Sequence, residues 1–279
     1  MRTPRLNIGT SSFSESDWVG PFYPKGLKPS EFLSIYARKY NIVEIDATYY
    51  RIPSKKIVDG WNAKTPDDFT ITAKFPRSIV HAGEGPIPNP GVILNPEMTY
   101  SERDSFLDVM SRLGRKLGPL VLQFPYFSSK VHLSPEMFSE CLDLFLNDLP
   151  DEFRYAVEIR NRNWLNESFL GMLKRHKAAL TLIDHPWMLH GDEIEAKFDP
   201  VTSNFVYIRL LGDRRKIESL VDKFDHEVND QSERLERWAR LISRMLKRDL
   251  EVMAFANNHF AGYSPGTADK LIEMTRKLN

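Results

Sequence analysis

The chain has 279 residues, of which 42% are hydrophobic, so it can bury a large core in one domain or two. Lysine plus arginine equals aspartate plus glutamate at 38 each, and the surface as a whole therefore has no long-range attraction for nucleic acid or anionic lipid. The amino-terminal segment lacks an apolar signal region and no stretch approaches the roughly 18 apolar residues of a membrane span, which predicts a cytoplasmic protein without a membrane partner.

Eight short apolar runs recur along the chain and predict β-strands. In chain order the runs span 6–11, 42–48, 69–75, 119–124, 154–160, 179–184, 205–211 and 250–257. Segments with helical periodicity lie between them. The main helix candidates span 29–40, 101–118, 134–149, 166–177 and 231–249.

The alternation of strands and helices predicts parallel pairing through crossover connections. Eight such units in a chain of this length are typical of a closed (β/α)8 barrel, the TIM-type fold, because closure removes both exposed sheet edges. The alternative, an open doubly wound sheet, usually has a glycine-rich phosphate turn after its first strand, whereas GTSSFSES at 9–16 contains one glycine. We therefore predict a single (β/α)8 barrel domain over residues 1–279.

Local signals describe the connections between these elements. Ser101 followed by Glu102 predicts the start of the helix after the third strand. The segment 76–100 is rich in proline and glycine and predicts an extended loop, and 185–204 is predicted to be irregular. Cys141 lies in an apolar helical pattern, which predicts a small buried side chain, and a single cysteine excludes a disulfide within the monomer.

Side-chain alternation along the strands predicts a charged cluster inside the barrel. Alternate residues of a barrel strand face the helices and the interior. In RYAVEIR the helix-facing set must be apolar, which turns Glu158 and Arg160 inward, near the carboxyl-terminal mouth where barrel enzymes perform their chemistry. In the other strands the same alternation turns inward Glu44, Asp46, Thr48, Thr70, Thr72, Lys74, Gln123, Tyr207 and Arg209.

Such a cluster has a purely structural interpretation, in which the carboxylates simply balance the cations. Taking an ion out of water costs several kcal/mol before pairing, and apolar replacements often serve stability equally well. Ionisable groups in perturbed environments also gather at functional sites. We therefore favour a ligand-binding or catalytic site at the mouth over a structural network.

A specific set of motifs runs in order from about residue 6 to the carboxyl terminus: IGTSSFSESDWVGPFYPKGL, VEIDATYYRIPS, FTITAKFPRSIVH, GPLVLQFP, YAVEIRNRNW, FVYIRLLG and MAFANNHFAGYSP. Together they resemble the domain of unknown function 72 family, the YecE-like proteins. The resemblance implies a TIM-type barrel without an established activity. Because that fold resembles the sugar isomerase and endonuclease IV barrels, it suggests phosphorylated sugars or abasic nucleic acid as ligands. Asp46 stands where asparagine is common in the family, and Leu211 where histidine is usual.

The first hypothesis is an enzyme that binds or transforms a small anionic, phosphorylated sugar-like ligand by metal-independent acid–base chemistry. Guanidinium groups bind phosphate bidentately, and a carboxylate or amine with a shifted pKa serves as a general base. The candidate catalytic residues are Glu44, Lys74, Glu158 and Asp184. The candidate ligand-binding residues are Thr10, Asp46, Tyr49, Gln123, Arg160, Arg209, Asn257 and Asn258.

Two other hypotheses stay open. One is a metal-dependent nuclease or nucleic-acid-binding protein of the endonuclease IV kind, in which Glu44, Glu158, Asp184 and His185 would hold a divalent metal ion. The sequence has no histidine pair with metal-binding spacing, so we predict no cofactor and no metal ligands. The other is a non-catalytic module that only binds its ligand. The oligomeric state is open as well.

Overall fold

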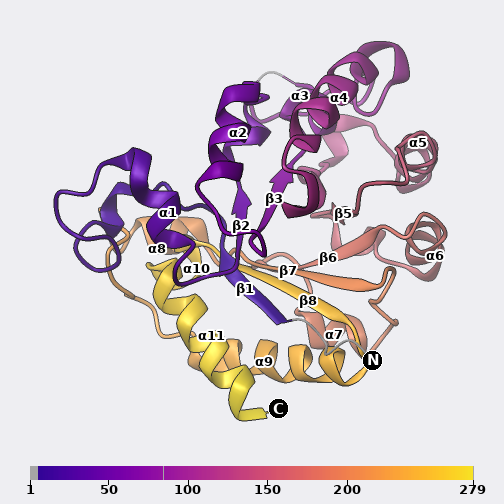
Figure 1. Cartoon of the computed structure of the whole chain (residues 1–279). Coiled ribbons are helices and arrows are strands. Elements are labelled where there is room, and N and C mark those ends of the chain that lie inside the picture. The colour runs from indigo at the N-terminus through magenta and orange to yellow at the C-terminus, as the bar shows by residue number, and fades with distance from the viewer. Residues whose placement is uncertain (1–5, 84, 279) are drawn as a thin grey trace.

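The computed structural model describes residues 6–83 and 85–278. In this part of the chain, eight parallel strands form one sheet that curves into a nearly closed barrel with helices around it (Figure 1). The strands are β1 (Leu6–Thr10), β2 (Ile42–Ile45), β3 (Thr70–Lys74), β4 (Leu117–Gln123), β5 (Tyr155–Glu158), β6 (Ala179–Asp184), β7 (Phe205–Leu210) and β8 (Glu251–Ala256). Each strand overlaps one of the predicted runs, and the predicted (β/α)8 barrel is confirmed.

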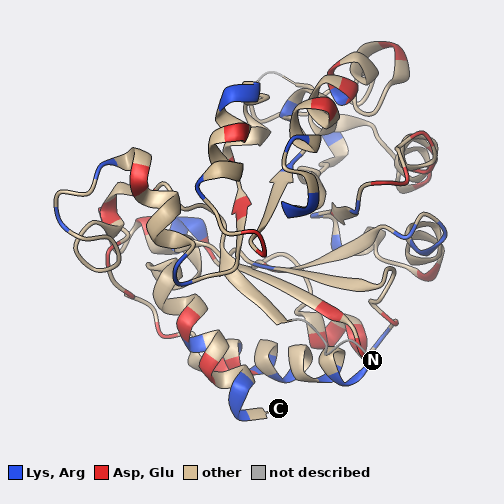
Figure 2. Cartoon of the chain, viewed as in Figure 1, with Lys and Arg blue, Asp and Glu red and all other residues tan. Residues whose placement is uncertain are grey.

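Helices of unequal length connect the strands. They are α1 (Phe32–Tyr36), α2 (Lys55–Ala63), α3 (Arg77–Val80), α4 (Pro96–Ser111), α5 (Pro135–Asn147), α6 (Glu167–Arg175), α7 (Gly191–Glu195), α8 (Arg214–Glu218), α9 (Ser232–Lys247), α10 (Asn258–Ala261) and α11 (Ser264–Leu278). Both Lys/Arg and Asp/Glu are distributed over the outer helices, in keeping with the balanced composition (Figure 2). Within the described residues, no helix has the length and apolar character needed to cross a membrane.

Three local predictions need correction. The helix after β3 begins at Pro96 rather than near Ser101, because the Asn95 side chain accepts a hydrogen bond from the Glu97 N–H at 3.0 Å and caps the helix earlier. The long segment before it contains α3, and the segment after β6 contains α7. Cys141 is exposed, because α5 turns Phe138, Leu142 and Phe145 inward and leaves position 141 on its outer side.

The barrel interior is filled rather than hollow. A layer of buried apolar side chains lies inside the strands and is separate from the core between strands and helices: Ile42, Val121, Ala156, Ala179, Phe205, Tyr207, Met253 and Phe255. At the amino-terminal end, Arg154 Nη1 pairs with Glu251 Oε2 at 2.6 Å, and Asn7 donates to Glu251 Oε1 at 3.1 Å. Above this apolar layer, toward the carboxyl-terminal mouth, the interior becomes polar and charged again.

The Tyr36 side chain links β1 and β2, the two strands at which the barrel closes. β1 and β2 are the two ends of the strand order, and the described residues show no paired backbone register between them. The buried Tyr36 hydroxyl accepts a hydrogen bond from the Thr10 N–H at 2.9 Å and donates one to the Ile42 carbonyl at 3.1 Å. The strands approach so closely that a Cβ at Gly9 would lie 2.2 Å from the Ile42 oxygen. Tyr36 thus satisfies two backbone groups at the seam between β1 and β2.

The Tyr36→Phe variant is expected to lose about 1–3 kcal/mol of unfolding free energy, because it leaves a buried N–H and a buried carbonyl without their partner. Urea unfolding of the variant and the wild type measures the loss. Tyr50→Phe is the matched control, since Tyr50 is 79% exposed and should change stability little. An unchanged midpoint for Tyr36→Phe would show that the hydroxyl does not hold the seam.

Candidate functional site

Arg209 is the centre of the charged cluster at the mouth. It projects inward from β7. Its Nε donates to Glu44 Oε1 at 3.0 Å, and its Nη2 lies 2.8 Å from the same oxygen. Its Nη1 donates to Glu158 Oε2 and, at 2.8 Å, to Gln123 Oε1. Glu44 lies on β2, Gln123 ends β4 and Glu158 ends β5. One guanidinium therefore connects four strands across the barrel.

A polar layer lies directly below this guanidinium. The Tyr207 hydroxyl donates to Glu44 Oε2 at 2.7 Å, and the Thr72 hydroxyl lies 2.9 Å from the Tyr207 hydroxyl. Both oxygens of Glu44 are thus engaged, and the carboxylate is completely buried. Below Tyr207 the interior continues as the apolar layer described above.

The outer rim of the cluster is more open than its centre. Lys74 Nζ lies 2.5 Å from Asp46 Oδ1 and 3.9 Å from Glu44 Oε1. Arg160 Nε donates to Glu158 Oε1 at 3.1 Å, and Arg160 Nη2 lies 3.0 Å from the same oxygen. The side chains of Asp46 and Arg160 are 32% and 27% exposed, whereas the Arg209 side chain is 2% exposed. A ligand in the mouth would therefore meet the rim residues first.

The cations decide the ionisation of the two buried glutamates. Burial alone would raise the pKa of Glu158, but Arg209, Arg160 and Lys74 outweigh it and lower that pKa to about 2. Burial likewise opposes ionisation of Glu44, and Arg209 and Lys74 again bring its pKa below the usual range. Both are ionised, fully hydrogen-bonded and weakly basic, so they suit the positioning of cations better than proton transfer.

Asp46 has the opposite electrostatic character. Burial raises the pKa of Asp46, and the neighbouring Glu44 carboxylate adds to this against the lowering effect of Lys74. Its Oδ1 is buried against Lys74, so the 32% exposure belongs to the rest of the side chain. Of the three carboxylates in the cluster, Asp46 is the one that combines access with a raised pKa.

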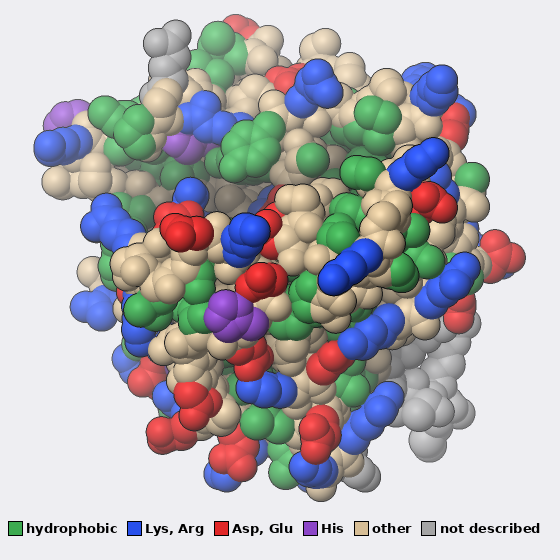
Figure 3. All heavy atoms as spheres, turned by 90° about the vertical axis from the view of Figure 1, so that its left-hand side faces the viewer, with side chains coloured by type: hydrophobic (Ala, Val, Ile, Leu, Met, Phe, Trp, Pro, Cys, Tyr) green, Lys and Arg blue, Asp and Glu red, His purple; other side chains and the backbone are tan. Residues whose placement is uncertain are grey.

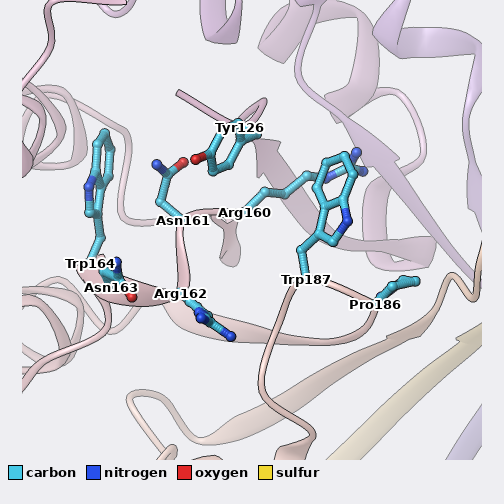
Figure 4. A pocket seen from close by; sticks show the side chains of 8 residues that line it. All are labelled: Tyr126, Arg160, Asn161, Arg162, Asn163, Trp164, Pro186 and Trp187. Carbon is cyan, nitrogen blue, oxygen red and sulfur yellow. The ribbon is translucent and has the colours of Figure 1, made fainter. Parts of the chain in front are cut away.

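A pocket of about 560 Å³ adjoins this cluster and shares Arg160 with it. Its lining contains two arginines, two asparagines, one proline and three aromatic residues, but no acidic side chain among those described. In Figure 4 the Arg160 side chain extends toward the Trp187 ring, and Trp164 stands on the opposite side of the pocket. The face that carries α8 and α10, just after the ends of β7 and β8, is hollowed in its upper half, with charged and hydrophobic side chains around the hollow (Figure 3).

His185 follows the last residue of β6 and contacts Trp187 of the pocket. Burial lowers the pKa of His185, and the nearby Arg160 charge lowers it further, so the ring is neutral near pH 7. Its Nδ1 accepts a hydrogen bond from the Trp187 N–H at 3.3 Å, and the two rings meet edge to face at 5.2 Å. His185 therefore supports Trp187.

The structure brings most of the predicted site residues together at the mouth. The group in direct or shared contact comprises Glu44, Asp46, Lys74, Gln123, Glu158, Arg160 and Arg209. Tyr49 is half-buried in a short turn after β2, and the charges of Arg77 and Arg160 act on its hydroxyl. Asn257 and Asn258 follow β8, but their side-chain oxygens accept from the His259 and Ser264 N–H groups, each at 3.0 Å. The two asparagines thus cap local turns.

Two predicted site residues do not reach the mouth. The inward positions of β6 are Ala179 and Thr181, so Asp184 lies on the outer face, where its Oδ2 accepts from Arg234 Nε at 2.6 Å and Trp238 Nε1 at 2.7 Å. Thr10 lies on the outer face of β1 against Tyr36. Placing Asp184 and Thr10 in the site was therefore wrong.

The set proposed for a metal ion does not converge either, because it included Asp184 together with Glu44, Glu158 and His185. Among the described residues, no group of three or more histidine, cysteine, aspartate or glutamate side chains is arranged to hold a metal ion.

Sequence reasoning missed Tyr126, Arg162 and Trp187. Tyr126 comes three residues after the last residue of β4, and Trp187 comes three residues after the last residue of β6. Because the carboxyl ends of parallel barrel strands share one rim, this common position after a strand was the available signal.

The fold and the site define a (β/α)8 barrel whose carboxyl-terminal mouth holds a buried charged network beside an open pocket. The chain belongs to the family described as "Protein of unknown function DUF72", whose model matches residues 7–279. It is 33% identical over 156 residues to UPF0759 protein YecE of Escherichia coli (strain K12); the match covers 56% of this chain and 48%, about half, of that relative. It is 21% identical to UPF0759 protein YunF of Bacillus subtilis (strain 168), across 96% of this chain and 94% of that protein.

Solved structures of the same family show the same fold. A DUF72 family protein from Thermotoga maritima is similar with a TM-score of 0.70 at 24% identity, over 98% of this chain and 99% of that chain. One from Enterococcus faecalis is similar with a TM-score of 0.67 at 20% identity, over 98% of both chains. The family and the fold expected from the motifs are thereby confirmed.

The stability of the protein is expected to depend on the ionisation of Glu158. Its pKa is 4.5 ordinarily and about 2 in the folded chain, so it contributes stability above pH 4.5 that is lost as the pH falls toward 2. At about 1.4 kcal/mol per pKa unit, the contribution is roughly 3 kcal/mol. Urea unfolding between pH 7 and pH 2.5 should show a steeper loss for the wild type than for Glu158→Gln.

Glu140→Gln is the matched control, because Glu140 is exposed on α5 and should leave the pH dependence unchanged. Parallel curves for the wild type and Glu158→Gln would contradict the assignment.

Proposed function

We propose that the mouth binds a small anionic, phosphorylated sugar-like ligand and transforms it by acid–base chemistry carried out by side chains alone. The observation that carries this proposal is the composition of the pocket: two arginines and three aromatic residues, with no carboxylate among the described lining residues. An anion placed there meets positive charge without a competing acidic side chain. The volume of about 560 Å³ falls in the range typical of small-molecule sites.

Arg160 is the proposed anion-binding residue. Its contacts with Glu158 use Nε and Nη2, which leaves Nη1 available to a ligand oxygen. Glu158 is itself held by Arg209, so the Arg160 guanidinium is oriented before the ligand arrives. Such preorganisation reduces the entropy lost on binding. In this proposal Glu158 and Glu44 are positioning residues rather than the general bases expected from the sequence.

Asp46 and Lys74 are the proposed proton-transfer pair. The raised pKa and the partial exposure of Asp46 suit a carboxyl group that gives or takes a proton. Lys74 Nζ, 2.5 Å away, stabilises the carboxylate once the proton has left. The pair is linked to the pocket through Arg209 and Glu158.

A binding module without turnover is the second candidate. The saturation of both buried glutamates by hydrogen bonds favours it, because such carboxylates hold cations in place but are poor proton-transfer groups.

The Arg160→Met variant is expected to bind ribose 5-phosphate and inorganic phosphate at least about ten-fold more weakly than the wild type, because a charge-assisted hydrogen bond contributes about 1.5–3 kcal/mol. Isothermal titration calorimetry at fixed ionic strength measures both ligands. Arg276→Met is the control. Arg276 is an exposed arginine of α11 that does not line the pocket, so this variant should bind as the wild type does. Equal affinities for Arg160→Met and the wild type would contradict anion binding in this pocket.

Replacing Asp46 by asparagine should abolish turnover while ligand binding is retained, because the amide keeps the shape but cannot exchange a proton. Phosphorus and proton NMR time courses with a panel of aldose phosphates would detect conversion. If a bound sugar phosphate is not converted by the wild type, the binding-module alternative is correct. If Asp46→Asn converts it at the wild-type rate, the assignment of Asp46 is wrong.

A further inference from the structure

Two large aromatic side chains beside the pocket stand open to solvent. Trp187 is 58% exposed and Tyr126 is 51% exposed. By contrast, Trp18 and Tyr23, in the connection after β1, are fully buried and pack with each other, with ring centroids 6.1 Å apart. Packing therefore explains the aromatic residues of that connection, but it does not explain why Trp187 and Tyr126 remain open at the edge of a pocket.

The two open rings are held in place. The Trp187 and Tyr126 rings meet edge to face, with centroids 6.1 Å apart and an interplanar angle of 66°. On another side, His185 contacts Trp187 edge to face and accepts its backbone N–H. A ring that is fixed by two neighbours and still more than half exposed offers a rigid flat surface for stacking.

The loop that carries Tyr126 and the loop that carries Arg160 are joined to each other. Asn161, which is 8% exposed, accepts from the Phe127 N–H at 2.9 Å and donates to the Phe127 carbonyl at 2.8 Å. Phe127 also stacks on Trp164 with an interplanar angle of 8°. These contacts tie the residue next to Tyr126 to the residue between Arg160 and Arg162. The loop of Tyr126 and the loop of Arg160 are thus joined, and in Figure 4 the Arg160 side chain extends toward the Trp187 ring.

We propose that the ligand is a nucleoside monophosphate, with its base against Trp187 and Tyr126 and its phosphate on Arg160. The proposal rests on the anion-binding function proposed above and names the ligand class. A sugar phosphate alone would use the Arg160 guanidinium but leave the flat surface of Trp187 unoccupied. A base has a flat π-face of the kind that stacks on aromatic side chains without requiring a particular sequence.

The test compares three probes by calorimetry at one ionic strength: adenosine monophosphate, cytidine monophosphate and ribose 5-phosphate. The wild type should bind both nucleotides at least about five-fold more tightly than ribose 5-phosphate. Trp187→Ala should weaken nucleotide binding by about 5- to 150-fold, which corresponds to the 1–3 kcal/mol of one stacked base. The same variant should leave the affinity for ribose 5-phosphate unchanged.

Tyr50→Ala is the matched control, because Tyr50 is an exposed tyrosine that does not line the pocket, and it should bind nucleotides as the wild type does. Circular dichroism should show the same fold for all variants, since the replaced side chains are largely exposed.

The outcomes separate the two proposals. Tight binding of ribose 5-phosphate with no gain from a base, and no effect of Trp187→Ala, overturns the nucleotide inference and leaves the proposed function standing. No binding of any of the three probes overturns both. Binding of a ten-residue thymidine oligonucleotide more than ten-fold tighter than either mononucleotide, with a steep salt dependence, overturns the small-ligand proposals in favour of a nucleic-acid strand.

Discussion

The carboxyl-terminal half of the barrel interior depends on the pairing of the buried Arg209 guanidinium with two carboxylates. A guanidinium without water needs carboxylates within hydrogen-bonding distance, and Glu44 and Glu158 supply them from opposite parts of the sheet. Those carboxylates are themselves fully buried, so they need further donors, which Tyr207 and Arg160 provide. Each buried carboxylate thus requires a further donor: on the Glu44 side the contacts end inside the barrel at Tyr207 and Thr72, and on the Glu158 side they reach the rim at Arg160.

This arrangement divides the cluster into two parts. Its buried floor consists of Glu44, Glu158 and Arg209, and its more accessible rim includes Asp46 and Arg160. The floor is saturated with hydrogen bonds and its glutamates stay ionised, so it can hold a geometry but exchanges protons poorly. The rim contains Asp46, whose carboxyl has a raised pKa, and Arg160, which belongs both to the floor network and to the pocket. The balance of three carboxylates and three cations keeps the cluster neutral overall, while the pocket lining itself carries only positive charge.

The residues whose direction in the barrel could be predicted and those whose direction could not differ in the strength of their local pattern. Glu44, Lys74, Glu158 and Arg209 each alternate with apolar neighbours, so one strand is enough to decide which way they point. β6 reads ALTLID and is buried throughout, so its pattern does not distinguish an inner from an outer face and does not reveal that Asp184 points outward. The same holds for Thr10, because β1 is short and its residues 7–10 are all buried.

Alone, the sequence determined the eight strands, the barrel and the inward direction of most of its charges, because two-residue alternation and apolar runs are properties of each segment by itself. The tertiary structure alone decided that Arg209 bridges Glu44 and Glu158, that Tyr36 closes the seam between β1 and β2, and that Trp187 and Tyr126 stand beside Arg160. These contacts join residues far apart in the chain, and their partners are set by how the barrel closes and how its loops pack, which no local pattern records.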